Sequence, residues 1–544
     1  MSRGPLAHRG VELAELKATK KGRRRNGFRL TATYQVTGWR FMHRRLRHAL
    51  IRRDTRMIDD PQKAQSAPLI LGMVLAVVVC VGAVVLSLFS RAGVVKDGKI
   101  VADKDSGALY VRIGDRLDPV TNLTSARLIA GSPANPVRVG AAEIAKYPRG
   151  SLVGIVGAPV EIRDSKDPWS IWTVCDTTVT GAAVPLDPVS GLPTIAVSPV
   201  VTTAIGGPLT PDQSTMVLGG NQARLFGYAN RTWLVYARPD GVVVRSLVDL
   251  NDRIVADALG LRADDPVLPI SPGLLNAVPA EPPLVAPPID GAGSPSTFAG
   301  DRPLTVGTIL RVTDLTGQAH YYVTLAAGVQ EVSHTAATMI RAANPLVSFE
   351  PVETSPAELA SFPKINQLAV SFYPSRALEL VSPTDDPITC WSWSHHGDEP
   401  TARTEVLVGP NLPLTPQQRA SRVQLVSAPT SGGVTADYVS LPPNTGRFVR
   451  ITGSATGSRT TGSDFWVADN GVRFGLDTSA GSNGADTLTA LGLRYPAPAP
   501  WVVVSLFAPG ATLSQKDALI RHDGVPPDLV VAGIDGNIDG KGMN

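Results

Sequence analysis

The chain has 544 residues, 43% of them hydrophobic, and a net charge of only +4. That small charge is an average over two parts. Residues 1–67 hold 17 Lys and Arg against 5 Asp and Glu, a net charge of +12, which leaves −8 for residues 68–544. The asymmetry excludes one uniformly charged body and predicts two parts that lie in different surroundings.

The first part contains a basic segment close to an apolar one. Residues 1–33 are expected to form a flexible basic tail, and in residues 34–67 apolar side chains recur at helical spacing between arginines, which predicts a basic amphipathic cytoplasmic helix. Such a helix can lie against anionic lipid head groups or against a partner protein, and the nearby membrane segment favours both over nucleic acid. The expected membrane or partner contacts are Trp39, Arg40, Arg44, Arg45, Arg47, Arg52, Arg53 and Arg56.

An apolar run of 22 residues, 68–89, contains no charged side chain. As a helix rising about 1.5 Å per residue it would be roughly 33 Å long, which predicts a transmembrane helix. A cleaved secretory signal fits less well, because the run is too long and starts too far from Met1. Since Lys and Arg stay on the cytoplasmic side, we expect a single-pass protein of the inner (plasma) membrane with a cytoplasmic N-terminus and a periplasmic bulk.

These N-terminal features resemble a known family. The stretch "FMHRRLRHALIRRDTRM", followed by "DDP" and a single membrane helix, is similar to the N-terminal signature of EccB, a membrane-core subunit of the mycobacterial type VII (ESX) secretion system. The exported region resembles that family as well, through its paired cysteines and its repeats, so the resemblance runs from about residue 31 onward. It implies a central β domain flanked by four repeat domains.

The exported region is rich in Gly and Pro, which favours short strands joined by turns, with occasional helices. Four segments are similar to one another, and each begins with an alternating strand and continues into a short helix. We therefore predict a mostly β fold with short helices (α+β) and a pseudo-twofold body. The expected boundaries are 103–159 for repeat 1, 160–237 for the first half of the central domain, 238–280 for repeat 2, 281–303 for a linker, 304–363 for repeat 3, 364–468 for the second central half and 469–522 for repeat 4.

The chain has three cysteines, of which Cys80 lies in the apolar run and the other two lie in the exported region. The blocks "WTVCDTTVTG" and "ITCWSWSHHG" around Cys175 and Cys390 parallel each other, which indicates two halves of one central domain. An oxidising compartment then predicts a disulfide between them, with Cα atoms about 5 to 6 Å apart. Two buried free thiols are the alternative.

No pattern in the sequence indicates a catalytic, metal or cofactor site. A G-x-x-x-x-G-K-[ST] phosphate loop and a G-x-S-x-G serine turn are both absent. The cluster "SHHGDEP" places His395 beside His396, but neighbours on a strand point to opposite faces and the spacing matches no zinc pattern, so we expect a polar loop. The aromatic residues near the cysteines are expected in the core rather than on a glycan-binding surface. They are Trp169, Trp172, Trp391, Trp393 and Trp466.

The expected function is that of a structural component of the ESX machinery, linking the inner-membrane translocon to a periplasmic assembly. By resemblance, the partners are EccC, the cytoplasmic motor ATPase, together with EccD, EccE, the mycosin protease and other EccB copies bound through the periplasmic body. The inner membrane is a further partner, and nucleic acid and cofactors are not expected. One alternative is a cell-envelope module that binds peptidoglycan or arabinogalactan, and another is the ATPase activity under which the family is sometimes catalogued.

Overall fold

The structure is a computed structural model, and the chain divides into two compact units, Met1–Ala92 and Gly93–Asn544. The tail 1–33 and Arg56 lie outside the residues that it describes. The described residues are 34–53, 63–89, 95, 98–164, 167–178, 200–298, 304–397, 399–427, 435–459, 461–478 and 484–524.

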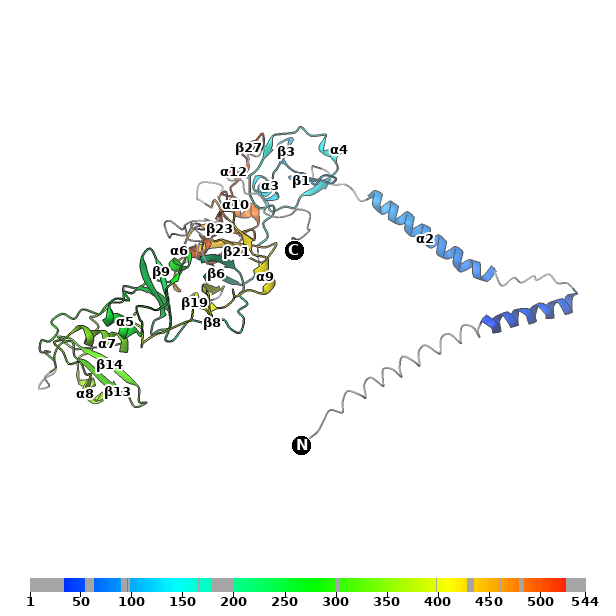
Figure 1. Cartoon of the computed structure of the whole chain (residues 1–544). Coiled ribbons are helices and arrows are strands. Elements are labelled where there is room, and N and C mark those ends of the chain that lie inside the picture. Colours follow the sequence, from blue (N-terminus) through cyan, green and yellow to red (C-terminus); the bar gives the residue numbers. More distant parts are fainter. Residues whose placement is uncertain are drawn as a thin grey trace, which may run out of the picture. The chain divides into compact units, whose positions relative to one another are not determined.

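Two helices make up the described part of the first unit (Figure 1). Residues 34–52 are helical, as the spacing of their apolar side chains predicts. Helix α2 (Lys63–Phe89) follows and contains the whole apolar run. Within the ranges given above, no helix combines the length and the apolar character that crossing a membrane requires. The single-pass topology therefore stays a prediction.

The second unit consists mostly of short strands with a few short helices, as expected. One order of elements occurs four times: three antiparallel strands, a helix, a strand parallel to the first strand, and a second helix. Repeat 1 consists of β1 (Ile100–Asp103), β2 (Leu109–Ile113), β3 (Arg116–Pro119), α3 (Leu123–Ala130), β4 (Val137–Val139) and α4 (Ala141–Ile144). Repeat 2 consists of β9 (Gln222–Tyr228), β10 (Arg231–Ala237), β11 (Val243–Leu247), α5 (Arg253–Leu259), β12 (Leu268–Pro269) and α6 (Pro272–Ala277).

The second half of the chain contains the same two motifs again. Repeat 3 consists of β13 (Ile309–Thr313), β14 (Ala319–Thr324), β15 (Val329–Val332), α7 (His334–Ala343), β16 (Val352–Glu353) and α8 (Pro356–Ser361). Repeat 4 consists of β22 (Gly446–Thr452), β23 (Asp464–Ala468), β24 (Val472–Gly475), α10 (Gly484–Leu491), β25 (Ala497–Pro500) and α11 (Trp501–Val504). In every repeat the fourth strand lies parallel to the first, and the helix between them supplies the crossover that parallel neighbours need.

The first helix of a repeat has clear start and stop signals in the sequence. Asn122, Asp252 and Ser333 stand at the N-caps of α3, α5 and α7, and each side chain accepts a hydrogen bond from a backbone N–H of the first turn. Gly131 and Gly260 end α3 and α5 in the left-handed conformation, with φ of 68° and 75°. The cap residues mark where α3, α5 and α7 begin, and the two glycines mark where α3 and α5 end.

Two repeats begin earlier than the sequence pattern indicates. The expected repeats 2 and 4 start at residues 238 and 469, whereas the repeated order of elements starts at β9 and β22, two strands before these positions. The sequence of a short alternating strand does not show which sheet the strand joins, because sheet membership depends on pairing with distant residues. We propose 222–277 and 446–504 as the bounds of these two repeats.

The expected linker is packed rather than exposed over part of its length. Leu284 and Ile289 are buried in a core that repeats 2 and 3 share. The connection is therefore part of the structure that joins those two repeats.

A seven-stranded sheet forms the centre of the second unit. Its order is β20 (Val423–Gln424), β21 (Tyr438–Ser440), β7 (Val200–Gly206), β6 (Trp169–Thr178), β18 (Ile388–His396), β19 (Arg403–Gly409) and β8 (Met216–Val217). Strands β6 and β18 come from the two expected halves of the central domain and run antiparallel as direct neighbours, with Trp172 opposite Trp393. Both halves of the chain thus contribute to one sheet.

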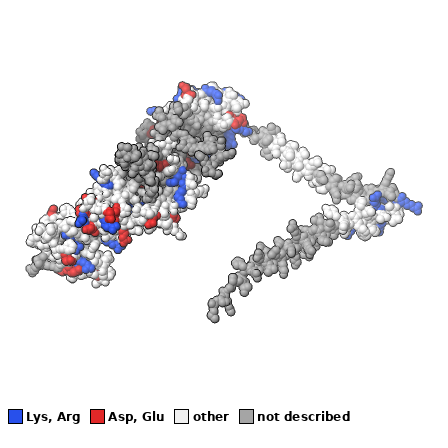
Figure 2. Space-filling view, viewed as in Figure 1, with Lys and Arg blue, Asp and Glu red and all other residues white. Residues whose placement is uncertain are grey.

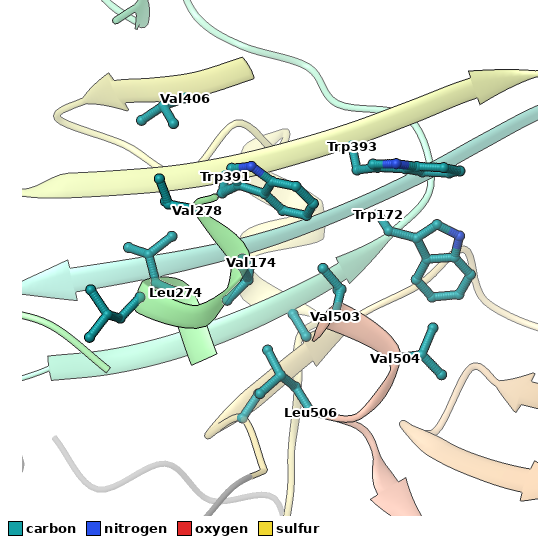
Figure 3. Close-up of a cluster of buried hydrophobic side chains, with 14 of the residues drawn as sticks. Trp172, Val174, Leu274, Val278, Trp391, Trp393, Val406, Val503, Val504 and Leu506 are labelled. Atoms are coloured by element: carbon teal, nitrogen blue, oxygen red, sulfur yellow. The ribbon is translucent and has the colours of Figure 1, made fainter. Parts of the chain in front are cut away.

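The second helices of repeats 2 and 4 cover one face of this sheet. Helices α6 and α11 pack against each other and against β6. Figure 3 shows Leu274 of α6 and Val503 of α11 facing the indole of Trp391 and the side chain of Val174. Each large apolar side chain buried in this way contributes roughly 1.5 to 3 kcal/mol.

The first helices join the repeats in pairs. Helix α3 of repeat 1 packs against α10 of repeat 4, and α5 of repeat 2 packs against α7 of repeat 3. Repeats 2 and 4 therefore each contact the central sheet and one outer repeat. Smaller elements complete the unit: β5 (Leu152–Val153), β17 (Glu379–Leu380), α9 (Pro416–Ala420), β26 (Ala508–Pro509), α12 (Gln515–Ala518) and β27 (Arg521–His522).

Candidate assembly surfaces

The basic helix has an exposed apolar side. Trp39, Met42, Leu46 and Leu50 are 67%, 58%, 60% and 78% exposed, respectively. The ring of Trp39 lies 5.0 Å from that of His43, one turn further along the helix. Of the expected contact residues, all but Arg56 are described. Figure 2 shows Lys and Arg side chains on this helix, whereas the described part of α2 carries no charged side chain.

The two cysteines of the second unit form a disulfide, as predicted. Cys175 of β6 lies directly opposite Cys390 of β18, and their sulfur atoms are 2.04 Å apart. The Cα atoms are 3.9 Å apart, closer than the expected 5 to 6 Å, because the bond joins directly opposed residues of adjacent antiparallel strands. Both cysteines are buried, whereas Cys80 is free and exposed.

A buried arginine of repeat 2 holds the segment that leads into β18. Arg224 of β9 donates from Nη1 to the hydroxyl of Thr389 at 2.6 Å and to the carbonyl of Ile388 at 3.3 Å. Its Nη2 donates to the carbonyls of Ser382, at 3.3 Å, and Asp386. Burial lowers the pKa of Arg224 to about 10, so the side chain stays charged at neutral pH.

Repeat 4 has an arginine at the position that corresponds to Arg224 in repeat 2, and this arginine contacts the segment that leads into β6. Arg447 of β22 donates to the carbonyl of Asp167 at 3.3 Å and to its carboxylate at 3.4 Å, just before β6 begins. The strand registers show the correspondence, since Arg224 and Arg447 each lie opposite a second-strand valine, Val235 or Val467. Each arginine joins a repeat to a central strand that the repeat does not directly precede or follow in the chain.

A second pair of arginines lies on the third strands of repeats 2 and 4, again with similar contacts in the two repeats. Arg245 of β11 donates to the carbonyl of Val278 at 3.0 Å, and Arg473 of β24 donates to the carbonyl of Ser505 at 3.2 Å. Each guanidinium also lies over a tryptophan ring, at 4.6 Å for Arg245 and 5.2 Å for Arg473. Burial lowers the pKa of both. Sequence reasoning missed these four arginines, although an arginine inside an otherwise apolar strand was a usable signal.

The carboxylate of Asp176 connects the disulfide strand to repeat 2. Its Oδ2 accepts from the backbone N–H of Ser271 at 2.7 Å, and its Oδ1 accepts from the hydroxyls of Ser271 at 2.8 Å and Thr202 at 2.9 Å. Ser271 is also the N-cap of α6. Burial, with a smaller contribution from the charge of Asp437, raises the pKa of Asp176 to about 6 against the effect of its hydrogen bonds.

The face of the central sheet that α6 and α11 leave uncovered borders a hollow of about 370 Å³. Trp169 and Val217 at this hollow are 39% and 55% exposed. The hollow is lined by Trp169, Ile171, Leu209, Pro211, Thr215, Val217, Ser392, Ser394, Glu405 and Leu407.

The two adjacent histidines lie at the end of β18, so the expectation of a polar loop was wrong for them. They have separate surroundings. The ring of His395 stacks on Trp393, with 5.9 Å between the centroids, and that of His396 lies 4.6 Å from Trp169. Asp398 lies outside the described residues. Among the residues that the structure describes, no group of three or more His, Cys, Asp or Glu side chains is placed to hold a metal ion. Trp169 was expected in the core but is exposed, so that prediction was wrong for it. The other four tryptophans are buried, as predicted, at most 2% exposed.

The order of elements and the cysteine pair can be compared with known proteins. The family model for EccB, described as type VII secretion system ESX-1, transport TM domain B, matches residues 28–527. The chain belongs to this family, as the N-terminal signature indicated.

Individual relatives agree over nearly the whole chain. The ESX-3 secretion system ATPase EccB3 of Mycolicibacterium smegmatis is 40% identical over 504 residues, which cover 92% of each chain. The ESX-5 secretion system ATPase EccB5 of Mycobacterium tuberculosis is 37% identical over 519 residues, 94% of this chain and 98% of the relative.

Two solved structures are similar as well. A chain of an intact ESX-5 inner membrane complex is 36% identical, with a TM-score of 0.70 and coverage of 92% of this chain and 97% of that one. The EccB3 dimer from the ESX-3 core complex gives 37% identity and a TM-score of 0.66, over 78% of this chain and all of that one.

Proposed function

We propose that this protein is a structural component of an ESX type VII secretion complex in the inner membrane. The observation that carries the proposal is the similarity, over 92% of this chain, to a chain of an intact ESX-5 inner membrane complex. In this proposal α2 spans the membrane once, residues 1–67 are cytoplasmic and the second unit is periplasmic, in accord with the charge asymmetry of the sequence.

The covalent order of the chain supports a linking role. The basic helix and α2 supply groups for the membrane side, and the second unit supplies surfaces for other EccB copies and for the mycosin protease. EccC, EccD and EccE are the partners that we expect at the membrane. The disulfide and the buried arginines connect the strands of the central sheet to each other and to repeats 2 and 4.

Purification in mild detergent tests the proposal. Native mass measurement of the full chain expressed with its proposed partners should give one large assembly that contains more than one copy of this protein. A single copy without partners that sediments with purified cell wall would contradict the proposal and support the alternative of peptidoglycan or arabinogalactan binding.

ATP hydrolysis is a second candidate because the names of the relatives include it. The sequence lacks the phosphate-loop pattern, so we attribute hydrolysis in the complex to EccC. Disabling the phosphate loop of EccC should abolish ATP hydrolysis by the purified complex. Activity that remains, and that co-purifies with this chain alone, would assign an ATPase site to it.

A further inference from the structure

The apolar side of the basic helix forms a narrow stripe. Trp39, Met42, Leu46 and Leu50 are spaced by three or four residues, which places them on one side of a helix. All four side chains are more than half exposed. A stripe of this kind on a helix of about 28 Å is covered in the working protein by a lipid surface or by another protein.

The charges around the stripe indicate what covers it. Residues 34–53 contain six arginines and two histidines and no Asp or Glu. At 100° per residue, Arg40 and Arg47 border the stripe on one side and Arg45 borders it on the other. A flat anionic surface complements cations on both edges of an apolar stripe, and tryptophan favours the boundary between apolar and polar layers.

The chain length between the helix and α2 permits this placement. Arg53 and Lys63 are ten residues apart, so the connection reaches at most about 36 Å. With α2 in the membrane, as proposed above, the helix cannot leave the neighbourhood of the inner leaflet. This step rests on the proposed function, whereas the stripe and its charges do not.

We infer that residues 34–53 lie on the inner leaflet and bind anionic phospholipid head groups. Trp39, Met42, Leu46 and Leu50 insert at the boundary of the acyl chains, and Arg40, Arg45 and Arg47 at the edges of the stripe contact the phosphates. Each arginine near such a surface contributes an attraction that salt weakens, because the screening length falls from about 10 Å at 0.1 M to about 3 Å at 1 M.

A fluorescent label on the full-length protein tests the inference. The variant Met42→Cys in a Cys80→Ser background has one accessible thiol, because Cys175 and Cys390 are bonded and buried. In lipid nanodiscs that contain phosphatidylglycerol, an environment-sensitive label at residue 42 should shift to the blue and brighten. Pure phosphatidylcholine discs, or 1 M salt, should remove most of the shift.

A matched label and a charge variant complete the experiment. The same label at His48→Cys, on the side away from the stripe, should report water in every disc. Replacing Arg40, Arg45 and Arg47 by Gln should abolish the shift at residue 42 while the protein still enters the discs.

Three results of the label measurements would overturn the inference. They are a water-exposed label at residue 42 in anionic discs, an equal shift in both kinds of disc, and a shift that occurs only when other proteins of the complex are added, which would identify a protein as the cover. A chain that does not enter discs at all contradicts the membrane anchor and this inference with it. A loss of complex formation while the lipid signal persists contradicts only the proposed function.

Discussion

At the scale of single residues, buried polar side chains decide how the repeats attach to the central sheet. Arg224 and Arg447 each donate to the chain segment that precedes a central strand. A carbonyl buried without a donor costs about 1 to 3 kcal/mol, so the loss of such an arginine affects several partners at once.

Replacing Arg224 by Met should lower the free energy of unfolding by about 2 to 4 kcal/mol, because several acceptors lose their donor. Arg231→Met is the matched control, since Arg231 lies on the neighbouring strand and is exposed. Thermal unfolding of the full chain in detergent measures both variants. Equal midpoints for the two would show that the buried contacts of Arg224 contribute nothing.

The buried carboxylate of Asp176 should make the stability of the second unit depend on pH. Its pKa is about 6 in the folded chain and about 4 in the unfolded chain, so the folded state binds the proton more tightly. The stabilisation is therefore present below pH 4 and is lost as the pH rises to 6, by about 3 kcal/mol at most.

Denaturant unfolding between pH 4 and 6 measures this slope. Asp176→Asn should flatten it. Asp212→Asn should leave it unchanged, because hydrogen bonds from Ser214 and Thr215 lower the pKa of the exposed Asp212 to about 2, below this range. A slope that persists in Asp176→Asn would assign the pH dependence to another group.

At the scale of elements, the sequence signals differed in what they could determine. The cysteines and the blocks around them indicated that β6 and β18 belong to one domain, because a covalent pair marks long-range proximity. The helices of the repeats were expected after each alternating strand, and α3 and α5 lie in such positions. The sequence did not indicate which sheets β9 and β22 join, because the alternation of a strand does not encode its pairing partners.

Replacing Cys175 and Cys390 by Ser should lower the free energy of unfolding by about 4 to 5 kcal/mol, since the unfolded chain regains the freedom of a loop of 215 residues. Cys80→Ser is the control and should change nothing, because Cys80 is exposed and unpaired. Non-reducing peptide mapping establishes the linkage in the purified protein. Free thiols at both positions, or a bridge between two chains, would contradict the structure.

At the scale of the whole molecule, the charge asymmetry predicts which side of the membrane each unit occupies. Protease added to spheroplasts should remove the chain after Phe89 and leave residues 1–67 protected, because 17 Lys and Arg hold the N-terminus in the cytoplasm. Antibodies against tags at the two ends follow the fragments. Digestion of the N-terminal tag with protection of the C-terminal one would reverse the topology.

The pairing of β6 with β18 also has a consequence for how the protein folds during its synthesis and export. If the chain is exported behind α2, Cys175 emerges 215 residues before the cysteine that completes it, and both repeat 2 and repeat 3 follow in that interval. Until β18 has been exported, β6 has no partner strand on that side, and such an unpaired strand edge promotes aggregation. Repeats 2 and 3 are then free to fold first, and the centre of the molecule closes last, when an oxidant can still reach two sulfurs that the finished sheet buries.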